Sequence, residues 1–505
     1  MARLPSVTWR RLALATLGAI ASSCAVATDY LGYNQKEAPP QEVSRPFTVL
    51  GELKCPDSYP NAYLEAGHRA EDIKAKIDAG YRQLFEGNGD NTPIYFDVGA
   101  DEGVIRDILH NNEVRTEGMG IGMMVAAMRD DRDKFDRLWR YARDNLEVTS
   151  GPLKGTFRSR CDLSAGSSES RECLDPYGLQ QFTMALVLAR QRWVPSPNMV
   201  DYGVEAARLF DAMLNKTTNV TDQGSGGAPA AGGGTSTIQG SSAAAGNVNV
   251  AITGAGAPNS LPPTNGTAGS SAVGGTFTGS DAGGTATVST GGASTVGSGK
   301  VEPTIFDKGS RLIFDDPASG AAVASTSSIM PGYYSVWAQL TSESFFFDAA
   351  ASGRTFLARA ANATTGLVPV REGFQLTPVA GWKDFTPEAY RALLNLAIDR
   401  IWGTSDKWQD AQVNALLDFL LDQDIRFYGN AFSLDGKAVL ASDHVPELVM
   451  AAAVVASISN HPDRKAFIEE AWNVPIPTGN SRYYAGIIYM VSNLILSGRF
   501  RLCPA

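Results

Sequence analysis

Apolar residues recur at intervals of three and four positions along most of this chain. Spacings of i, i+3, i+4 and i+7 mark the buried face of an α-helix, and here they persist over stretches of roughly 12–20 residues. The helices predicted in this way cover 66–87, 116–129, 131–146, 177–193, 199–215, 331–342, 344–362, 387–402, 406–422, 444–459, 463–473 and 481–498. Only Pro93–Val98 and Leu312–Phe314 resemble strands, so the pattern predicts an all-α protein.

Several of these helices are separated by very short connections, such as Asp130 alone or Gly403–Ser405. Short connections make consecutive helices antiparallel neighbours. About twelve helices in paired order correspond to six hairpins, which is the number in an (α/α)6 barrel. Periodicity alone also leaves a helical bundle or a solenoid open.

One long segment interrupts the helical pattern. Residues 221–300 contain 21 of the 51 glycines, a single aromatic residue and three charged residues. Such a Gly/Ala/Ser/Thr-rich tract buries too little apolar surface to offset the entropy lost on ordering. We predict a disordered insertion in a surface loop, because closing a longer loop costs little extra free energy. Residues 29–220 and 301–505 are then one domain; a Gly-rich β-solenoid is the alternative for the tract, which lacks a strict period.

The N-terminal residues have the pattern of an export signal. Arginines precede the short apolar stretch Leu12–Ala21, and Ala25–Ala27 matches a cleavage site. Cys24 lies in a sequence that resembles a lipid-attachment box. We therefore expect residues 1–28 to act as a signal peptide, with Cys24 either removed or lipid-anchored. The protein is then exported to the periplasm, the outer surface or the medium.

The other four cysteines fit an oxidising compartment. Cys161 and Cys173 flank a polar loop and form one candidate disulfide, while Cys55 and Cys503 lie near the two chain ends and form another. The chain has no C-x-x-C pair, only four histidines and no H-E-x-x-H motif. We therefore expect no metal site.

Charge and motifs exclude several classes of protein. The formal net charge is −10, whereas a nucleic-acid-binding protein needs a basic surface. No internal apolar run approaches the roughly 18–20 residues of a membrane span. The glycines at 118–122 lack the context of a dinucleotide loop, and neither a phosphate loop nor a G-x-S-x-G nucleophile motif is present. We predict no cofactor.

A single carboxylate, Glu117, stands at the start of a predicted helix in the segment Arg115–Met124. Small and apolar residues follow it, so its charged form would be desolvated and its pKa raised toward that of a general acid. The alternative is structural, with Thr116 capping the helix and Glu117 interacting with the helix dipole.

Arg115–Met124 resembles the general-acid signature of glycoside hydrolase family 8. Further blocks resemble the family in the same order, and the last two are similar to the branch that releases xylose from the reducing ends of xylo-oligosaccharides. They are Ile94–Gly99, Phe182–Leu186 with Trp193, Pro331–Ala338, Trp472–Tyr484 and Ser497–Arg501.

The resemblance implies an (α/α)6 barrel and an inverting mechanism. Inversion needs a carboxylic acid and a carboxylate base about 6.5–9.5 Å apart, with a water molecule between the base and the sugar. By match, Glu117 is the acid, and Glu388 stands where the family has an aspartate base within F-x-x-D-A-x-R. The same match gives Arg391, Tyr334 and His444 roles in binding substrate or positioning water.

Other positions depart from the family. Tyr177 replaces an aspartate of the substrate site, for which Asp175 is a substitute, and Ala485 replaces another acidic residue. Trp382, in a polar loop, is the best candidate for stacking on a sugar. We expect an enzyme acting on β-1,4-linked oligosaccharides, xylo-oligosaccharides above all. The alternatives are a weakened or inactive carbohydrate-binding surface protein and a structural envelope lipoprotein. The oligomeric state is not fixed by the sequence.

Overall fold

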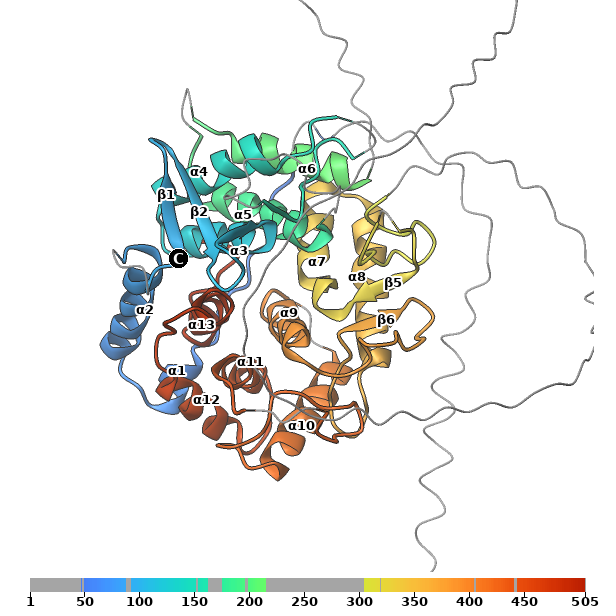
Figure 1. Ribbon diagram of the computed structural model, residues 1–505. Coiled ribbons are helices and arrows are strands. Elements are labelled where there is room, and N and C mark those ends of the chain that lie inside the picture. The colour runs from blue at the N-terminus through green and yellow to red at the C-terminus, as the bar shows by residue number, and fades with distance from the viewer. Residues whose placement is uncertain are drawn as a thin grey trace, which may run out of the picture. The chain divides into compact units, whose positions relative to one another are not determined.

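Long helices alternate between an inner and an outer ring in the computed structural model (Figure 1). The structure describes residues 47, 50–87, 92–150, 153–161, 175–195, 199–214, 304–317, 319–403, 406–439 and 443–504. The inner ring consists of α3 (Thr116–Met128), α5 (Pro176–Arg192), α7 (Pro331–Thr341), α9 (Tyr390–Ile401), α11 (Pro446–Ser457) and α13 (Arg482–Leu496). The outer ring consists of α2 (Ala70–Phe85), α4 (Arg132–Tyr141), α6 (Tyr202–Leu214), α8 (Ser344–Ala360), α10 (Lys407–Asp422) and α12 (Arg464–Asn473).

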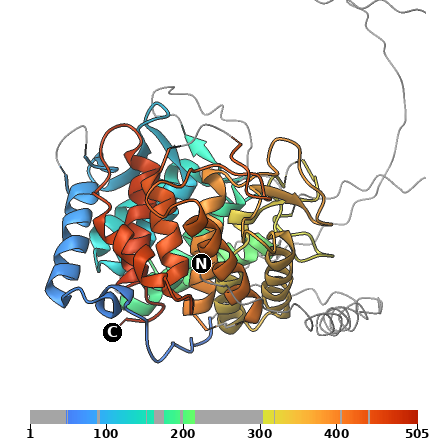
Figure 2. The same cartoon turned by 90° about the horizontal axis from the view of Figure 1, so that it is seen from below.

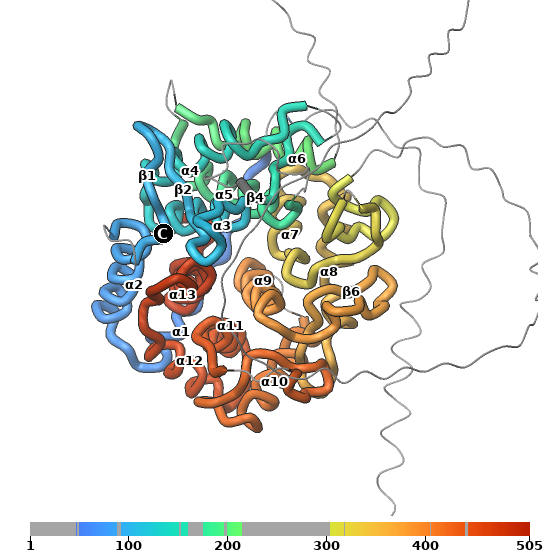
Figure 3. The backbone as a smooth tube through the Cα atoms, in the orientation of Figure 1, coloured from blue at the N-terminus to red at the C-terminus, as the bar shows by residue number. Residues whose placement is uncertain are grey.

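The rings close because α13 packs against α3 as well as against α11. Seen along the barrel, α3, α13, α11 and α9 follow one another around the centre (Figure 3). From the side, the helices run along a common direction (Figure 2). This is the (α/α)6 barrel expected from the paired helices, and the described residues on both sides of 215–303 form one unit.

The inner helices bury nearly all of their residues and the outer helices only some, and this difference follows from the amino-acid composition of each helix. In α13, 14 of 15 residues are buried, and in α3, 11 of 13. The outer helix α10 buries only 5 of its 16 residues, all on one side. An enclosed helix must be apolar all round, whereas an outer helix needs only one apolar face. The continuous apolar stretches in the sequence therefore became the inner ring.

All twelve predicted helices occur, and the described residues contain one more, α1 (Ala62–Ala66). Two predicted helices are irregular at one end. The helix predicted over 131–146 ends in a π-helical turn, Ala142–Leu146, and the one predicted over 387–402 begins with a 3₁₀ turn, Pro387–Ala389. The predicted signal peptide and the insertion at 221–300 lie outside the described residues.

The strands are short and form two small antiparallel sheets. One has the order β1 (Tyr95–Val98), β2 (Glu102–Asp107), β3 (Glu113–Arg115) and β4 (Arg160–Cys161); the other pairs β5 (Val323–Ser325) with β6 (Arg371–Gly373). The strand predicted at Leu312–Phe314 was wrong, because Ile313 forms only an isolated bridge with Phe306. Among the described residues, the neighbours of this short segment form no further bridge, so the single bridge does not extend into a strand.

The two ends of the barrel differ in their connections. Residues 129–131 and 342–343 link helices tightly at one end, whereas the sheets and long loops lie at the other. At that second end, which we call the mouth, five inner helices begin, at Thr116, Pro176, Tyr390, Pro446 and Arg482. Helix α7 begins deeper, since Gly332 packs against Asp399 in the third turn of α9.

The opposite end holds the N- and C-terminal parts of the described chain together. A disulfide joins Cys55 to Cys503, the pair that the sequence analysis named. The Leu502 amide donates to the Tyr59 hydroxyl at 3.1 Å. The other candidate pair, Cys161 and Cys173, lies outside the side chains that the structure describes. Within the described residues, no helix has both the length and the apolar character needed to cross a bilayer.

Candidate active site

The mouth gathers the first turns of five inner helices. Each helix start carries a partial positive charge from its unpaired amide groups, and this charge favours nearby carboxylates. Proline at the first turn of α5 and α11 fixes where those helices begin. Glu117, in the first turn of α3, therefore lies at the mouth.

Glu117 forms an ion pair with Arg391, which lies in the first turn of α9. The side chains are 16% and 13% exposed, respectively, so water screens the pair only in part. The Arg391 guanidinium also lies 4.7 Å from the ring centre of Tyr177 and 5.8 Å from that of Tyr484. Two aromatic rings and one carboxylate thus fix Arg391 in place.

Glu388 precedes Arg391 by three residues, in the 3₁₀ turn that leads into α9. The Tyr484 hydroxyl donates to the Pro387 carbonyl at 2.6 Å and holds this turn against α13. Glu388 is exposed, yet the protein around its carboxyl desolvates it and raises its pKa above the ordinary value. Arg371 and Arg115 act in the opposite direction, and Asp315 raises the pKa further.

Thus the structure brings Glu117, Arg391 and Glu388 to one end of the barrel. The link is direct for Glu117 and Arg391, and it continues through the helical turn between Arg391 and Glu388. The roles of Glu117 as acid and Glu388 as base stay predictions.

Asp175 takes part in local structure. Its carboxylate accepts a hydrogen bond of 2.6 Å from the Thr116 hydroxyl, which joins the starts of α3 and α5. Burial raises the pKa of Asp175, while Thr116 and the amides of Gly178 and Tyr177 lower it. A side chain at Gly178 would collide with Thr116, so these two helix starts are in close contact.

Tyr177 is 8% exposed and lies against the Arg391 guanidinium. Burial raises the pKa of its hydroxyl well above the ordinary value, so it stays neutral. An aspartate at this position would offer a sugar two hydrogen-bond acceptors and a charge, whereas Tyr177 offers an aromatic ring and one hydroxyl.

Tyr334 lies inside the barrel wall rather than at the mouth. It is 1% exposed, packs edge-on against Phe306, and its hydroxyl donates to the Ser328 carbonyl at 3.3 Å. The reason is the deep start of α7. Its predicted contact with the catalytic water stays a prediction.

His444 precedes α11. Its Nδ1 atom lies 3.0 Å from the Tyr428 carbonyl, and its ring meets the Tyr428 ring edge-on at 4.5 Å. Trp382 is 36% exposed, and the Arg371 guanidinium lies 3.8 Å from its ring centre. Trp382, the residue predicted to stack on a sugar, therefore keeps part of its side chain accessible.

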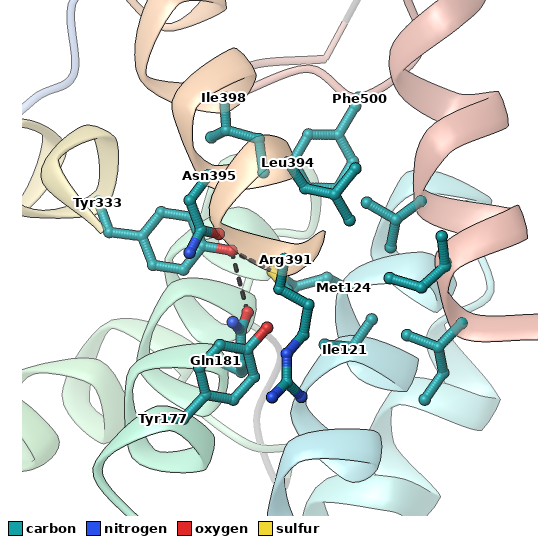
Figure 4. Close-up of a pocket in the computed structure, with 13 residues that line it drawn as sticks. Ile121, Met124, Tyr177, Gln181, Tyr333, Arg391, Leu394, Asn395, Ile398 and Phe500 are labelled. Atoms are coloured by element: carbon teal, nitrogen blue, oxygen red, sulfur yellow. Dashed lines mark hydrogen bonds between the residues drawn. The ribbon is translucent and has the colours of Figure 1, made fainter. Parts of the chain in front are cut away.

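A small cavity is lined by Arg391 together with residues of α3, α5, α7, α9 and α13 (Figure 4). Its volume is about 20 Å³, which is room for a water molecule but not for a sugar ring. Apolar side chains dominate its wall, and the Tyr333 hydroxyl donates to Gln181 Oε1 at 2.9 Å.

Several mouth residues were missed by the sequence analysis. Asp315 and Arg371 form an ion pair of 2.8 Å near Glu388. Glu447, in the first turn of α11, has a pKa raised by burial, and its charge acts on Tyr484. Glu447 follows a proline at a helix start as Glu388 does, and this repeated Pro-Glu pair was the available signal. Among the described residues, no three His, Cys, Asp or Glu side chains gather to hold a metal ion.

The barrel and the carboxylates at its mouth fit the matches to known proteins. Residues 97–221 match the model of the family described as Glycosyl hydrolases family 8. The fold and the order of the motifs agree with this match, so the chain is similar to the glycoside hydrolases of family 8.

Individual relatives match over nearly their whole length. The reducing-end xylose-releasing exo-oligoxylanase Rex8A of Paenibacillus barcinonensis is 28% identical over 466 residues, covering 88% of this chain and 97% of the relative. An exo-oligoxylanase of the same description from Halalkalibacterium halodurans is 25% identical over 459 residues, covering 88% and 94%. The structure of Rex8A complexed with xylose aligns with a TM-score of 0.67 and 26% identity, covering 89% of this chain and 98% of that one.

Proposed function

We propose that this protein hydrolyses β-1,4-linked xylo-oligosaccharides with inversion, with Glu117 as general acid and Glu388 as general base. The observation that carries the proposal is the convergence of these two acids from sequence positions 271 residues apart, through Arg391, at the mouth. The names of the relatives describe release of xylose from reducing ends, and the Rex8A structure holds xylose.

Each acid has its own task in the proposed reaction. Arg391 holds Glu117 at a helix start, which orients its carboxyl before a substrate arrives. This ion pair favours the charged carboxylate, so in the proposed reaction Glu117 must first take up a proton, which it then donates to the leaving oxygen. Glu388 is exposed on the adjacent turn, where it can accept a proton from water. The water oxygen then attacks the anomeric carbon as the glycosidic bond breaks, and the configuration at that carbon inverts.

Substitution of each acid tests this function. We expect Glu117→Gln and Glu388→Gln each to lose at least about a hundredfold in kcat on xylo-oligosaccharides, as general catalysts contribute about 10²–10⁴-fold. The anomer first released, followed by NMR, should be inverted. Glu71→Gln, at an exposed outer-ring residue, is the control and should retain activity. Loss in Glu447→Gln with full activity in Glu388→Gln would instead make Glu447 the base.

A second candidate function is carbohydrate binding without hydrolysis. Tyr177 occupies the place of a substrate-site carboxylate, and Asp175 is engaged by Thr116. Heat of binding in calorimetry, without turnover on xylo-, cello- or chito-oligosaccharides, would establish this second function.

We also propose that the protein is exported. The disulfide between Cys55 and Cys503 supports this, because such bonds persist in oxidising compartments. Fractionation of cells with antibody detection tests it: protein confined to the cytoplasmic fraction would contradict export. Labelling with a radioactive fatty acid, lost in Cys24→Ala, would distinguish a lipid anchor from simple cleavage.

A further inference from the structure

One side chain at the mouth connects an acid with an aromatic ring. Arg371 Nε lies 2.8 Å from Asp315 Oδ2, and the same guanidinium lies 3.8 Å from the centre of the Trp382 ring. At this distance the cation and the ring are in direct contact. Arg371 thus covers one face of the indole, and its ion pair with Asp315 restricts its movement.

The backbone around these residues is held firmly. Arg371 belongs to β6, which pairs with β5, and its amide donates to the Trp382 carbonyl at 3.0 Å. The neighbouring Val370 amide donates to the Asp384 carbonyl at 3.1 Å. Two separate chain segments, 312–317 and 370–384, therefore present the Asp315–Arg371–Trp382 group as a unit.

The indole remains accessible despite these contacts. Trp382 is 36% exposed although the Arg371 guanidinium lies over one face of its ring. An exposed, rigidly held indole is the surface on which the apolar face of a pyranose stacks, and little conformational entropy is lost on binding.

The group lies close to the proposed base. The charges of both Arg371 and Asp315 act on the Glu388 carboxyl. The loop that contains Trp382 also runs directly into the turn of Glu388, with Phe385 paired to Phe432 by two backbone hydrogen bonds. A sugar on Trp382 would therefore lie next to the site of reaction.

We propose that Trp382 is a sugar-binding residue of a pyranose subsite beside Glu388, and that Arg371 and Asp315 are the residues that position its indole. The occupant is one ring of a β-1,4-linked oligosaccharide, so the inference rests on the proposed function and extends it. Sugar binding at this subsite uses stacking on an aromatic ring rather than hydrogen bonds to a carboxylate.

Binding to an uncleaving protein tests the subsite independently of hydrolysis. In the Glu117→Gln background, xylotriose should change tryptophan fluorescence, and calorimetry gives Kd. Adding Trp382→Phe should abolish the fluorescence change, and Trp382→Ala should weaken Kd about tenfold, equivalent to about 1.4 kcal/mol. Trp472→Phe is the matched control, because His68 stacks on that ring at 3.8 Å on the outer helix α12, and its Kd should not change.

The positioning role of Arg371 and Asp315 needs a measurement that would not change if these residues only stabilised the fold. Separate values of KM and kcat provide it. Asp315→Ala in the otherwise unchanged enzyme should raise KM several-fold with kcat little affected, and Asp315→Glu should restore part of the loss. An unchanged melting temperature excludes a folding defect.

The outcomes separate the subsite from the hydrolase. An unchanged Kd in Trp382→Ala overturns the subsite, and so does absence of binding to xylo-, cello- and chito-oligosaccharides alike. Binding that depends on Trp382 in a protein without any turnover would support the subsite and contradict the hydrolase.

Discussion

At the scale of single residues, Glu388 should set the acidic limb of the activity profile. A base must be ionised, and desolvation raises the pKa of Glu388 above the ordinary glutamate value of about 4.3. As pH falls, Glu388 therefore gains its proton earlier than a solvated glutamate would. We expect kcat/KM to fall on the acid side with an apparent pKa above that ordinary glutamate value. Measuring kcat/KM against pH in buffers of constant ionic strength checks this.

The neighbours of Glu388 should move that limb in opposite directions. Arg371 lowers the pKa of Glu388, so Arg371→Met should shift the limb to higher pH. Asp315 raises that pKa, so Asp315→Asn should shift the limb to lower pH. The variants are compared by the pH at the midpoint of the acidic limb and not by the magnitude of kcat/KM, because both substitutions also affect substrate binding. Shifts of the same sign would mean that Glu388 is not the group that titrates.

The sequence indicated these site residues unevenly. Glu117 and Glu388 stand in segments that resemble a known signature, so position in a motif was enough to name them. Asp315 and Arg371 belong to no motif and meet only because β5 pairs with β6. Tyr334 was named from its motif, but the depth at which α7 begins depends on packing against α9, which no local pattern encodes.

At the scale of elements, helix positions were predictable because burial in a barrel repeats with the helical period. Predicted and observed limits of α3, α7 and α12 agree within a residue or so. The short strands escaped prediction: β4 has two residues and β3 three, too few for any alternation to show. Their extended form depends on partners that are distant in sequence.

Close contact between inner helices depends on glycine. A Cβ atom at Gly120 of α3 would lie 2.5 Å from the Gln181 Cβ atom and 3.0 Å from the Phe182 nitrogen of α5. Backbone cannot yield as a flexible side chain can, so Gly120→Ala should destabilise the protein by about 1–3 kcal/mol. In α6, a Cβ at Gly203 would meet mainly the flexible side chain of Arg190, so Gly203→Ala should leave stability unchanged or slightly raised. Calorimetric melting of both variants checks this, and equal melting temperatures would contradict it.

At the scale of the whole molecule, the topology assembles the site. Glu117 and Arg391 are 274 residues apart, on opposite sides of the long predicted insertion, and meet because the ring of inner helices closes. Since inner helices run in one direction, their positively polarised starts collect at one end, where carboxylates are stabilised. The other end carries the Cys55–Cys503 disulfide, which stabilises the barrel.

That other end should control stability without controlling chemistry. The Cys55–Cys503 disulfide spans 448 residues and joins the N- and C-terminal segments of the described chain. Cross-links over long loops restrict the unfolded chain most, up to about 5 kcal/mol. A reductant, or Cys55→Ser with Cys503→Ser, should therefore lower Tm clearly. The proposed site lies at the mouth, far from the disulfide, so kcat/KM at about 25 °C should change by less than about twofold. In the double variant a reductant should have no further effect on Tm; an equal Tm with and without the bond would show that packing of Tyr59 and Leu502 alone holds the two ends.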